Sequence, residues 1–206
     1  MSFDSPAKIV SYLIGRQVGD QLKTSQFPGF DLDLLTKGIA DSLADAVMPL
    51  QQDQIEEAYD VIQAEMQKAA AERAKAARAE GDAFLAENAK RDGIVTTASG
   101  LQYEVISAGN GNGKQPTRNS RVSTHYHGTF IDGRVFDSSV QRGQPAEFPV
   151  SGVIAGWTEA LQLMKEGDKW RLYVPSDLAY GERGSSGAIP PHCALVFEVE
   201  LLKVMD

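Results

Sequence analysis

The sequence predicts an α+β protein with an N-terminal all-α domain, a long connecting α-helix and a C-terminal antiparallel β-sheet wrapped around a short helix. Two changes in composition and residue pattern along the chain support this prediction. Residues 51–92 contain no proline and are dominated by alanine, glutamate, glutamine, lysine and arginine, which lose least on entering a helix. Beyond Gly93, short segments of alternating apolar and polar residues begin, a pattern typical of strands. We therefore divide the chain into residues 1–50, 51–92 and 93–206.

Two shorter helices are expected to precede the long one. Ser5 can cap a helix over residues 5–23, because a serine oxygen accepts hydrogen bonds from the free amides of a first helical turn. A turn signal at residues 27–29 follows, and Asp31 or Asp33 can then begin a second helix. The apolar residues predicted to face inward in this second helix are Leu32, Leu35, Ile39, Leu43 and Val47.

The long helix, roughly 60 Å in length at the usual rise per residue, is expected to have two unlike halves. Its first half carries an apolar seam at 4-3-4-3 spacing, which requires a packing partner. Between Arg73 and Ala83 no apolar side chain is larger than alanine, so we expect the second half to be an exposed arm. The alternative is an ordinary core helix followed by a disordered charged linker. The seam residues are Ile55, Tyr59, Ile62, Met66 and Ala69; the charge pairs expected to support the helix are Glu65–Lys68, Glu72–Lys75, Arg78–Asp82 and Glu87–Arg91.

The three predicted helices provide only a small core, because two of them are short. Segments below about 70 residues commonly need a staple or oligomerisation to be stable. We therefore expect residues 1–69 to form a homodimer, with helices exchanged between the protomers. The alternative is a monomeric three-helix bundle.

The bulk composition argues against several classes of function. A net charge of −8 disfavours nucleic acid as a partner, because phosphate binding requires clustered lysine and arginine. No apolar run approaches the roughly 18 residues of a membrane span, and the first residues lack the features of a signal peptide. Cys193 is the only cysteine, so no internal disulfide can form. These features indicate a cytoplasmic protein without a membrane partner.

Six strands and one short helix are expected after Gly93. The helix, at residues 157–164, interrupts the series, so the strands are predicted to form an antiparallel sheet curled around it. The predicted strands are Leu101–Ser107, Arg121–Phe130, Arg134–Ser138, Ala146–Val150, Lys169–Val174 and Ala194–Val204.

The familiar catalytic patterns are weak in this half of the chain. Three glycines at 109, 111 and 113 are not followed by a helix, so a flexible loop is expected there and not a phosphate site. His125 and His127 share one face of a strand whose other face is more apolar, so they are expected to point away from the core. We expect no metal, no cofactor and no covalent nucleophile.

Five short segments are more specific, and they occur in a defined order between about residues 101 and 203. They are His125-Tyr126-His127-Gly128, Val135-Phe136-Asp137-Ser138-Ser139, Val153-Ile154-Ala155-Gly156-Trp157, Ala179-Tyr180-Gly181 and Ile189-Pro190-Pro191-His192. This set resembles the FKBP-type peptidyl-prolyl cis-trans isomerases. The front half is similar to the dimeric bacterial branch of that family, the macrophage infectivity potentiator-like proteins. Over the whole chain the resemblance is closest to the cytoplasmic 22 kDa bacterial FKBP.

The resemblance implies an FKBP-like fold and a pocket whose residues act in catalysis and in substrate binding. Trp157 would form the floor, and the Asp137 carboxylate, the Tyr180 hydroxyl and the Ile154 N–H would be its polar contacts. Many relatives carry a histidine where this chain has Ser185 and Ser186, and Ala188 is small, so rim contacts are expected to differ. The walls would come from Tyr126, Phe136, Phe148, Val153, Ile154 and Phe197, and further substrate contacts from Arg142 and from Ile189 at the rim.

The resemblance also implies the reaction, the rotation of X–Pro bonds in unfolded or partly folded proteins. The dimer would add chaperone-like binding of those substrates, and macrolides such as rapamycin and tacrolimus are expected inhibitors. Two alternatives from other classes stay open. One is a non-catalytic interaction module that only binds proline-containing partners, and the other is a purely structural dimer.

Overall fold

The computed structural model describes residues 2–23, 25–185 and 187–205, so the expectation for Ser186 lies outside the described residues. The chain forms two compact units, Met1–Ala70 and Ala71–Asp206. This division differs from the predicted one, because the long helix is shared between the units instead of forming a segment of its own.

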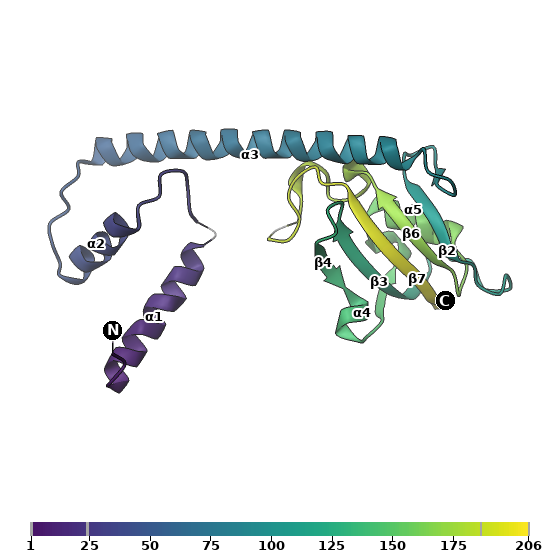
Figure 1. Ribbon diagram of the computed structural model, residues 1–206, viewed down its shortest axis with the longest axis horizontal. Helices are drawn as coiled ribbons and strands as arrows, with labels where there is room; N and C mark the ends of the chain where they lie inside the picture. Colours follow the sequence, from purple (N-terminus) through teal and green to yellow (C-terminus); the bar gives the residue numbers. More distant parts are fainter. Residues whose placement is uncertain (1, 24, 186, 206) are drawn as a thin grey trace. The chain divides into compact units, whose positions relative to one another are not determined.

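The first unit contains the two short helices expected from the sequence, α1 (Pro6–Leu22) and α2 (Leu32–Leu43) (Figure 1). The predicted caps are present: the Ser5 hydroxyl accepts from the amide of Lys8, and the Asp31 carboxylate accepts from two amides at 2.8 and 3.0 Å. Helix α2 ends at Leu43, and Val47 is 92 % exposed in the irregular segment after the turn at Ala44 and Asp45, so the prediction that Val47 faces inward was wrong. Of the other four residues predicted to face inward, Leu32, Ile39 and Leu43 are also exposed in the single chain, and Leu35 is half-buried.

The long helix α3 (Gln52–Asn88) is continuous, as predicted. Its C-terminal half belongs to the second unit, and there the expectation of an exposed arm was wrong. Gly81, Leu85 and Asn88 are buried, at the 4-3 spacing of one helix face. The small residues allow close approach: a Cβ atom placed on Gly81 would lie 3.0 Å from Cβ of Ala194. A glycine that costs helix stability is thus explained by packing.

Two of the predicted charge pairs on α3 are replaced by contacts with the sheet unit. Arg78 pairs with Asp177 at 2.9 Å instead of with Asp82. Arg91 donates to Asn88 at 2.7 Å and to the Tyr173 hydroxyl at 3.0 Å instead of pairing with Glu87. Both arginines therefore attach α3 and the turn after it to residues far away in the sequence.

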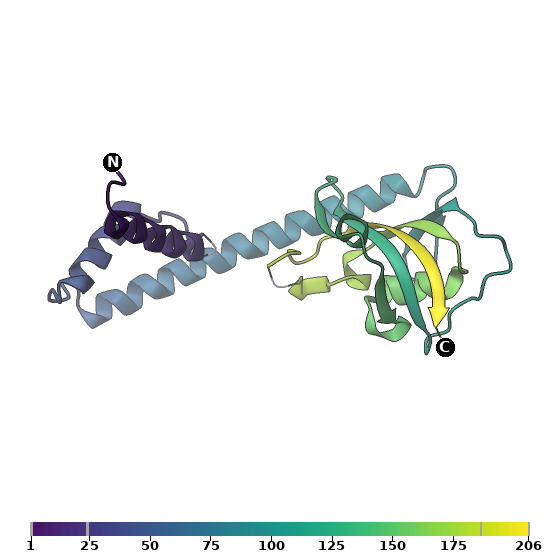
Figure 2. The same ribbon diagram turned by 90° about the horizontal axis from the view of Figure 1, so that it is seen from below.

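The second unit is built on one antiparallel sheet in the order β1-β2-β6-β7-β3-β4, with β5 paired to β3 (Figures 1 and 2). All six predicted strands are present, and the two-residue strand β1 was not foreseen. Two short helices complete the unit. The strands are β1 (Val95–Thr96), β2 (Gln102–Ser107), β3 (Arg121–Phe130), β4 (Val135–Ser138), β5 (Ala146–Pro149), β6 (Lys169–Val174) and β7 (Leu195–Met205); the helices are α4 (Ser139–Arg142) and α5 (Ala155–Leu163).

The core of this unit lies between the sheet and α5, as the alternation of the strands predicts. On β3 the side chains of Val122, Thr124 and Tyr126 are buried, whereas His125 and His127 lie on the other face. Each histidine ring nitrogen Nδ1 lies about 3 Å from a serine hydroxyl, at 3.1 Å for His125 and 3.0 Å for His127. The two histidines therefore point away from the core, as expected.

The glycine loop before β3 is held in place, contrary to the expected flexible loop. Gly109 donates to the Asp168 carboxylate at 2.8 Å, and Glu166 donates its amide to the Lys114 carbonyl at 3.0 Å. A side chain on Gly109 or Gly113 would collide with the Glu166 carbonyl oxygen. The glycines are therefore needed for a close backbone approach.

The outer face of the sheet carries a network of charges that borders the end of α3. Arg171 donates to Glu104 at 2.8 Å and to Glu198 at 2.5 Å, and the Tyr173 hydroxyl donates to Glu104 at 2.7 Å. Burial acts to raise the pKa of Glu104, but the bonds from Tyr173 and Arg171 outweigh it and leave the pKa lowered. The bond from Arg171 lowers the pKa of Glu198 against its burial.

We expect the network to lose its stabilising effect in acid. Because both folded pKa values are lowered, the contribution is complete above the ordinary glutamate value of about 4.3 and is lost as the pH falls through the folded values. The variant Glu104→Gln/Glu198→Gln should be less stable at pH 7 and lose less stability between pH 5 and 3. Urea unfolding at several pH values measures this. Glu147→Gln, at an exposed position without a described ion pair, is the control; equal pH slopes in both variants would refute the prediction.

Candidate active site

A cavity of about 240 Å³ opens beside α5 in the second unit. Its volume lies below the roughly 300–1,000 Å³ of pockets for drug-sized molecules, so it suits a single small ring. The cavity is lined by Tyr126, Phe136, Asp137, Phe148, Gly152, Val153, Ile154, Trp157, Tyr180 and Phe197.

The lining residues come from most elements of the unit. The strands supply the aromatic walls, from β3, β4, β5 and β7, while α5 supplies Trp157. Gly128 on β3 lies opposite Phe197 in the sheet, and a Cβ at this glycine would lie 2.7 Å from the ring of Phe136 and 3.0 Å from that of Phe197. Because Gly128 has no side chain, the rings of Phe136 and Phe197 can occupy the space beside it.

Aromatic edges fix the shape of the cavity. The Trp157 ring centre lies 5.4 Å from that of Tyr126, 5.7 Å from that of Phe148 and 5.3 Å from that of Phe197, each in an edge-to-face arrangement. Phe136 packs edge-to-face against Phe197 at 5.5 Å. Edge-to-face pairs are the favoured geometry of aromatic rings, so the cavity is preformed.

One corner of the cavity is polar. The Tyr126 hydroxyl donates to the Asp137 carboxylate at 2.5 Å, and Arg142 donates to the other oxygen of Asp137 and, at 2.9 Å, to the Tyr126 hydroxyl. The Arg142 guanidinium also lies over the Tyr126 ring, 5.6 Å from its centre. Asp137 is thus held by two donors at the cavity wall.

This arrangement keeps Asp137 ionised. Burial acts to raise the pKa of Asp137, but the bonds from Tyr126 and Arg142 and the charge of Arg142 outweigh it and leave the pKa lowered. Burial and the bond to Asp137 raise the pKa of Tyr126. At neutral pH the corner therefore holds a carboxylate and a neutral phenol, and Asp137 has no proton to give.

Besides the buried indole N–H of Trp157, two donors at the cavity have no partner among the described residues. The Ile154 amide precedes α5, where the first N–H groups of a helix have no intrahelical acceptor. The Tyr180 hydroxyl makes no hydrogen bond to a described residue, and burial together with the nearby Asp137 charge raises its pKa. Both groups are available to a carbonyl oxygen that enters the cavity.

The structure brings together nine of the eleven residues expected at the site. Arg142 does not line the cavity, although it contacts two residues that do. Ile189 lies in the core cluster, 7 % exposed, and does not line the cavity either. Gly152 lines it and was not foreseen, since glycine offers no side chain for a sequence argument; its position directly before Val153 was the available signal.

The described residues contain no group of three or more histidine, cysteine, aspartate or glutamate side chains that could hold a metal ion. In the same part of the chain, every helix is too short or too polar to span a bilayer.

An antiparallel sheet around one helix, with an aromatic cavity and a fixed carboxylate, defines a domain with room for one small apolar ring. Comparisons with known proteins agree with this class. The family described as FKBP-type peptidyl-prolyl cis-trans isomerase matches residues 112–202, and the family described as domain amino terminal to FKBP-type peptidyl-prolyl isomerase matches residues 7–105.

Relatives match over nearly the whole chain. The FKBP-type 22 kDa peptidyl-prolyl cis-trans isomerase of Escherichia coli is 48 % identical, over 99 % of this chain and 98 % of the relative. The outer membrane protein MIP of Legionella longbeachae is 43 % identical, over 95 % of this chain and 84 % of the relative. The crystal structure of FkpA from Escherichia coli matches with a TM-score of 0.71 and 35 % identity, over 98 % of both chains. The chain belongs to the FKBP-type peptidyl-prolyl cis-trans isomerase family, and it is an isomerase of that class.

Proposed function

We propose that the aromatic cavity is where this isomerase binds proline and rotates the X–Pro bond of unfolded or partly folded proteins. The observation that carries this proposal is the lining: apolar rings on almost every side, two free donors and one carboxylate that is already held. Such a site has no group poised for bond cleavage, and the reaction needs none. The ring of a proline fits a cavity of this size and character.

The proposed mechanism relies on the loss of amide resonance during rotation. The barrier of roughly 18–20 kcal/mol arises because the C–N bond has partial double-bond character. The rotated amide has lost the charge separation of the planar form, so an apolar cavity disfavours the planar state more than the rotated one. The Ile154 amide and the Tyr180 hydroxyl would orient the substrate carbonyl, while Asp137 and Tyr126 keep the wall in place.

The Asp137→Ala variant is expected to lower kcat/KM on a proline-containing tetrapeptide about ten-fold. The change leaves the Tyr126 hydroxyl and Arg142 without their shared acceptor, and a hydrogen bond to a charged group contributes about 1.5–3 kcal/mol. The assay follows the cis-to-trans rate of the peptide. Asp132→Ala, which removes an exposed partner of Arg134 outside the cavity, is the control.

Two results would contradict this assignment. Unchanged turnover by a folded Asp137→Ala protein would remove Asp137 from the site. Peptide binding without turnover by the unmodified chain would favour the alternative, a non-catalytic module that binds proline-containing partners.

We further propose that the first unit forms a homodimer. None of its described residues, 2–23 and 25–70, is buried, so this unit lacks a core of its own. A hollow of about 1060 Å³ is lined mainly by apolar residues, including the predicted seam residues Ile55, Tyr59, Ile62 and Met66. A second copy of the unit would cover these side chains. The match of residues 7–105 to the amino-terminal family supports the proposal.

The dimer would add chaperone-like binding, because two sites in one molecule raise the effective concentration of the second contact. We expect the full chain to have twice the chain mass of 22.3 kDa in solution and residues 71–206 to be monomeric, as measured by light scattering. Both should isomerise a tetrapeptide equally fast, while only the full chain accelerates refolding of a proline-limited protein. Equal rates on the protein substrate would reject the chaperone role.

Two finer predictions complete the proposal. Rapamycin and tacrolimus are expected to compete with the peptide for the cavity, and a titration of the tetrapeptide assay tests this. The cytoplasm stays the predicted compartment, and cell fractionation tests it.

A further inference from the structure

Tyr180 lines the cavity from the long connection between β6 and β7. The other lining residues lie on strands, on α5 or in the segment that leads into α5. The first part of this connection is a short 3-10 turn, Ser176–Leu178, and the last part is His192–Ala194. Both parts lie against the C-terminal half of α3, which is in the same compact unit. Helix α3 therefore contacts side chains both before and after Tyr180 in the sequence.

Arg78 of α3 makes the polar part of this contact. Its guanidinium donates to both carboxylate oxygens of Asp177, at 2.9 and 3.4 Å. The same side chain lies 3.5 Å from Nδ1 of His192, and Nδ1 is the acceptor because a guanidinium can only donate. Arg78 thus contacts both Asp177 and His192, which are fifteen residues apart in the sequence and have Tyr180 between them.

The His192 end is coupled directly to the residue after Tyr180. The amide of His192 donates to the carbonyl of Gly181 at 2.9 Å. His192 has a φ of 58°, in the left-handed region that a non-glycine residue adopts only when its surroundings hold it there. The next contact on α3, Gly81 against Ala194, fixes the helix close to this end. Tyr180 is therefore bracketed by Asp177 before it and by the Gly181–His192 bond after it.

We propose that Arg78 is a positioning residue for the isomerase site, acting through Asp177 and His192 on the placement of Tyr180. This inference rests on the proposed role of the cavity. It assigns a part in the reaction to a residue of the long helix, outside the sheet and far from the cavity lining in sequence. Arg78 touches no substrate; it holds the backbone on which the Tyr180 hydroxyl and ring are presented.

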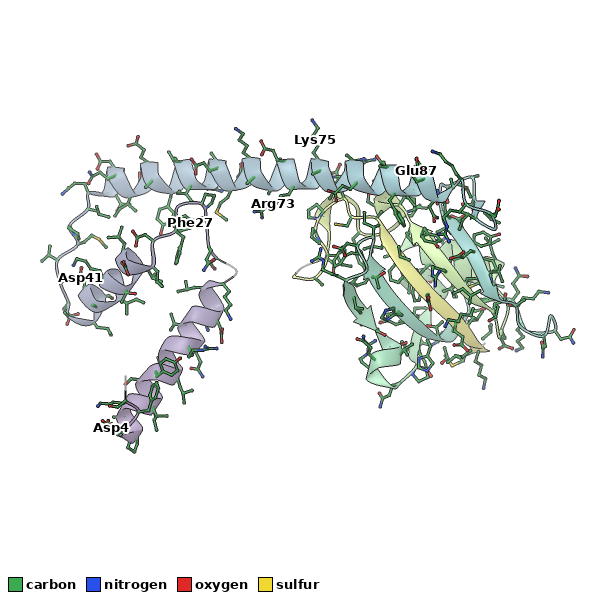
Figure 3. All side chains as sticks on the ribbon, in the orientation of Figure 1. Asp4, Phe27, Asp41, Arg73, Lys75 and Glu87 are labelled. Atoms are coloured by element: carbon green, nitrogen blue, oxygen red, sulfur yellow. The ribbon has the colours of Figure 1, made fainter. Side chains whose placement is uncertain are left out.

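The test uses the full chain and a double-mutant cycle. Arg78→Ala is expected to lower kcat/KM on the tetrapeptide about two- to five-fold, the range that an exposed ion pair carries. In the Tyr180→Ala background the same change should have no further effect, because the residue that Arg78 positions is gone. Lys75→Ala is the matched control: it is exposed, and Figure 3 shows its side chain on the side of α3 away from the sheet.

Asp177→Asn provides a second variant that reaches the same contact from the other side. It should lower kcat/KM as much as Arg78→Ala does. The double variant Arg78→Ala/Asp177→Asn should lower kcat/KM no further than either single variant. Amide hydrogen exchange at His192, whose N–H donates to the Gly181 carbonyl, should rise in both variants and stay unchanged in Lys75→Ala. These readouts separate positioning from a general loss of stability, which urea unfolding measures directly.

Several results would overturn the inference. One is full activity of both Arg78→Ala and Asp177→Asn. Another is a fall in kcat/KM on Arg78→Ala that is equally large with and without Tyr180→Ala. An absence of turnover in the unmodified chain is a different outcome, because it would reject the proposed function of the cavity itself.

Discussion

Replacing Phe136 by alanine is expected to lower kcat/KM on a proline-containing tetrapeptide about ten- to a hundred-fold. The ring forms a wall of the cavity, packs edge-to-face on Phe197 and occupies the space above Gly128. Removing a fully buried phenylalanine costs about 3–5 kcal/mol. Phe136 is only partly buried, and a loss of about half that amount from transition-state binding corresponds to this range. The peptide assay measures the effect, with unfolding in urea measured in parallel.

Phe130→Ala is the matched control for this prediction. Its ring packs against Phe136 with centres 5.3 Å apart but does not line the cavity. It should therefore reduce stability with a much smaller effect on turnover. A Phe136→Ala protein that folds and retains full activity would show that this wall does not contribute to catalysis.

A fragment of residues 94–206 is expected to be about 2.5–6 kcal/mol less stable than residues 71–206. It lacks Leu85, whose burial contributes about 1.5–3 kcal/mol, and it leaves Gln102 without two partners, which costs about 1–3 kcal/mol. Gln102 donates to the Leu85 carbonyl at 2.9 Å and accepts from Asn88 at 2.8 Å. The difference approaches the whole stability of a small domain.

Urea unfolding of the two fragments measures this difference, and Leu85→Ala in residues 71–206 isolates the apolar part. That variant alone should cost about 2–5 kcal/mol. Equal unfolding midpoints for the two fragments would show that the face of α3 contributes nothing to the unit. The practical consequence is that a catalytic fragment should begin near residue 71 and not at the apparent boundary at Gly93.

Features set by local chemistry were predictable from the sequence. Ser5 and Asp31 begin their helices because short polar side chains satisfy the free amides of a first turn. The bounds of β3 and β6 match the predicted ones because their alternating residues face a core and a polar side. The lining of the cavity was expected from the family resemblance, and the geometry places nine of those residues together.

Features set by contacts between distant segments were not predictable. Between Arg73 and Ala83 the sequence offers no apolar side chain larger than alanine, so a helix face that packs closely because its residues are small was interpreted as exposed. Arg78 has Asp82 one turn away, but its partner in the fold is Asp177, 99 residues further on. Ile189 was expected at the rim of the cavity, but its side chain is buried in the core cluster.

The position of β7 governs when this unit can fold. The last strand of the chain lies between β6 and β3, and these two strands have no other link within the described sheet. During synthesis the N-terminal segments and α3 leave the ribosome first, but the sheet cannot close until Leu195–Met205 has emerged. Pairings of such large sequence separation form late and slowly. A prematurely terminated chain would therefore expose both flanking strands and be a substrate for degradation, not a partly active enzyme.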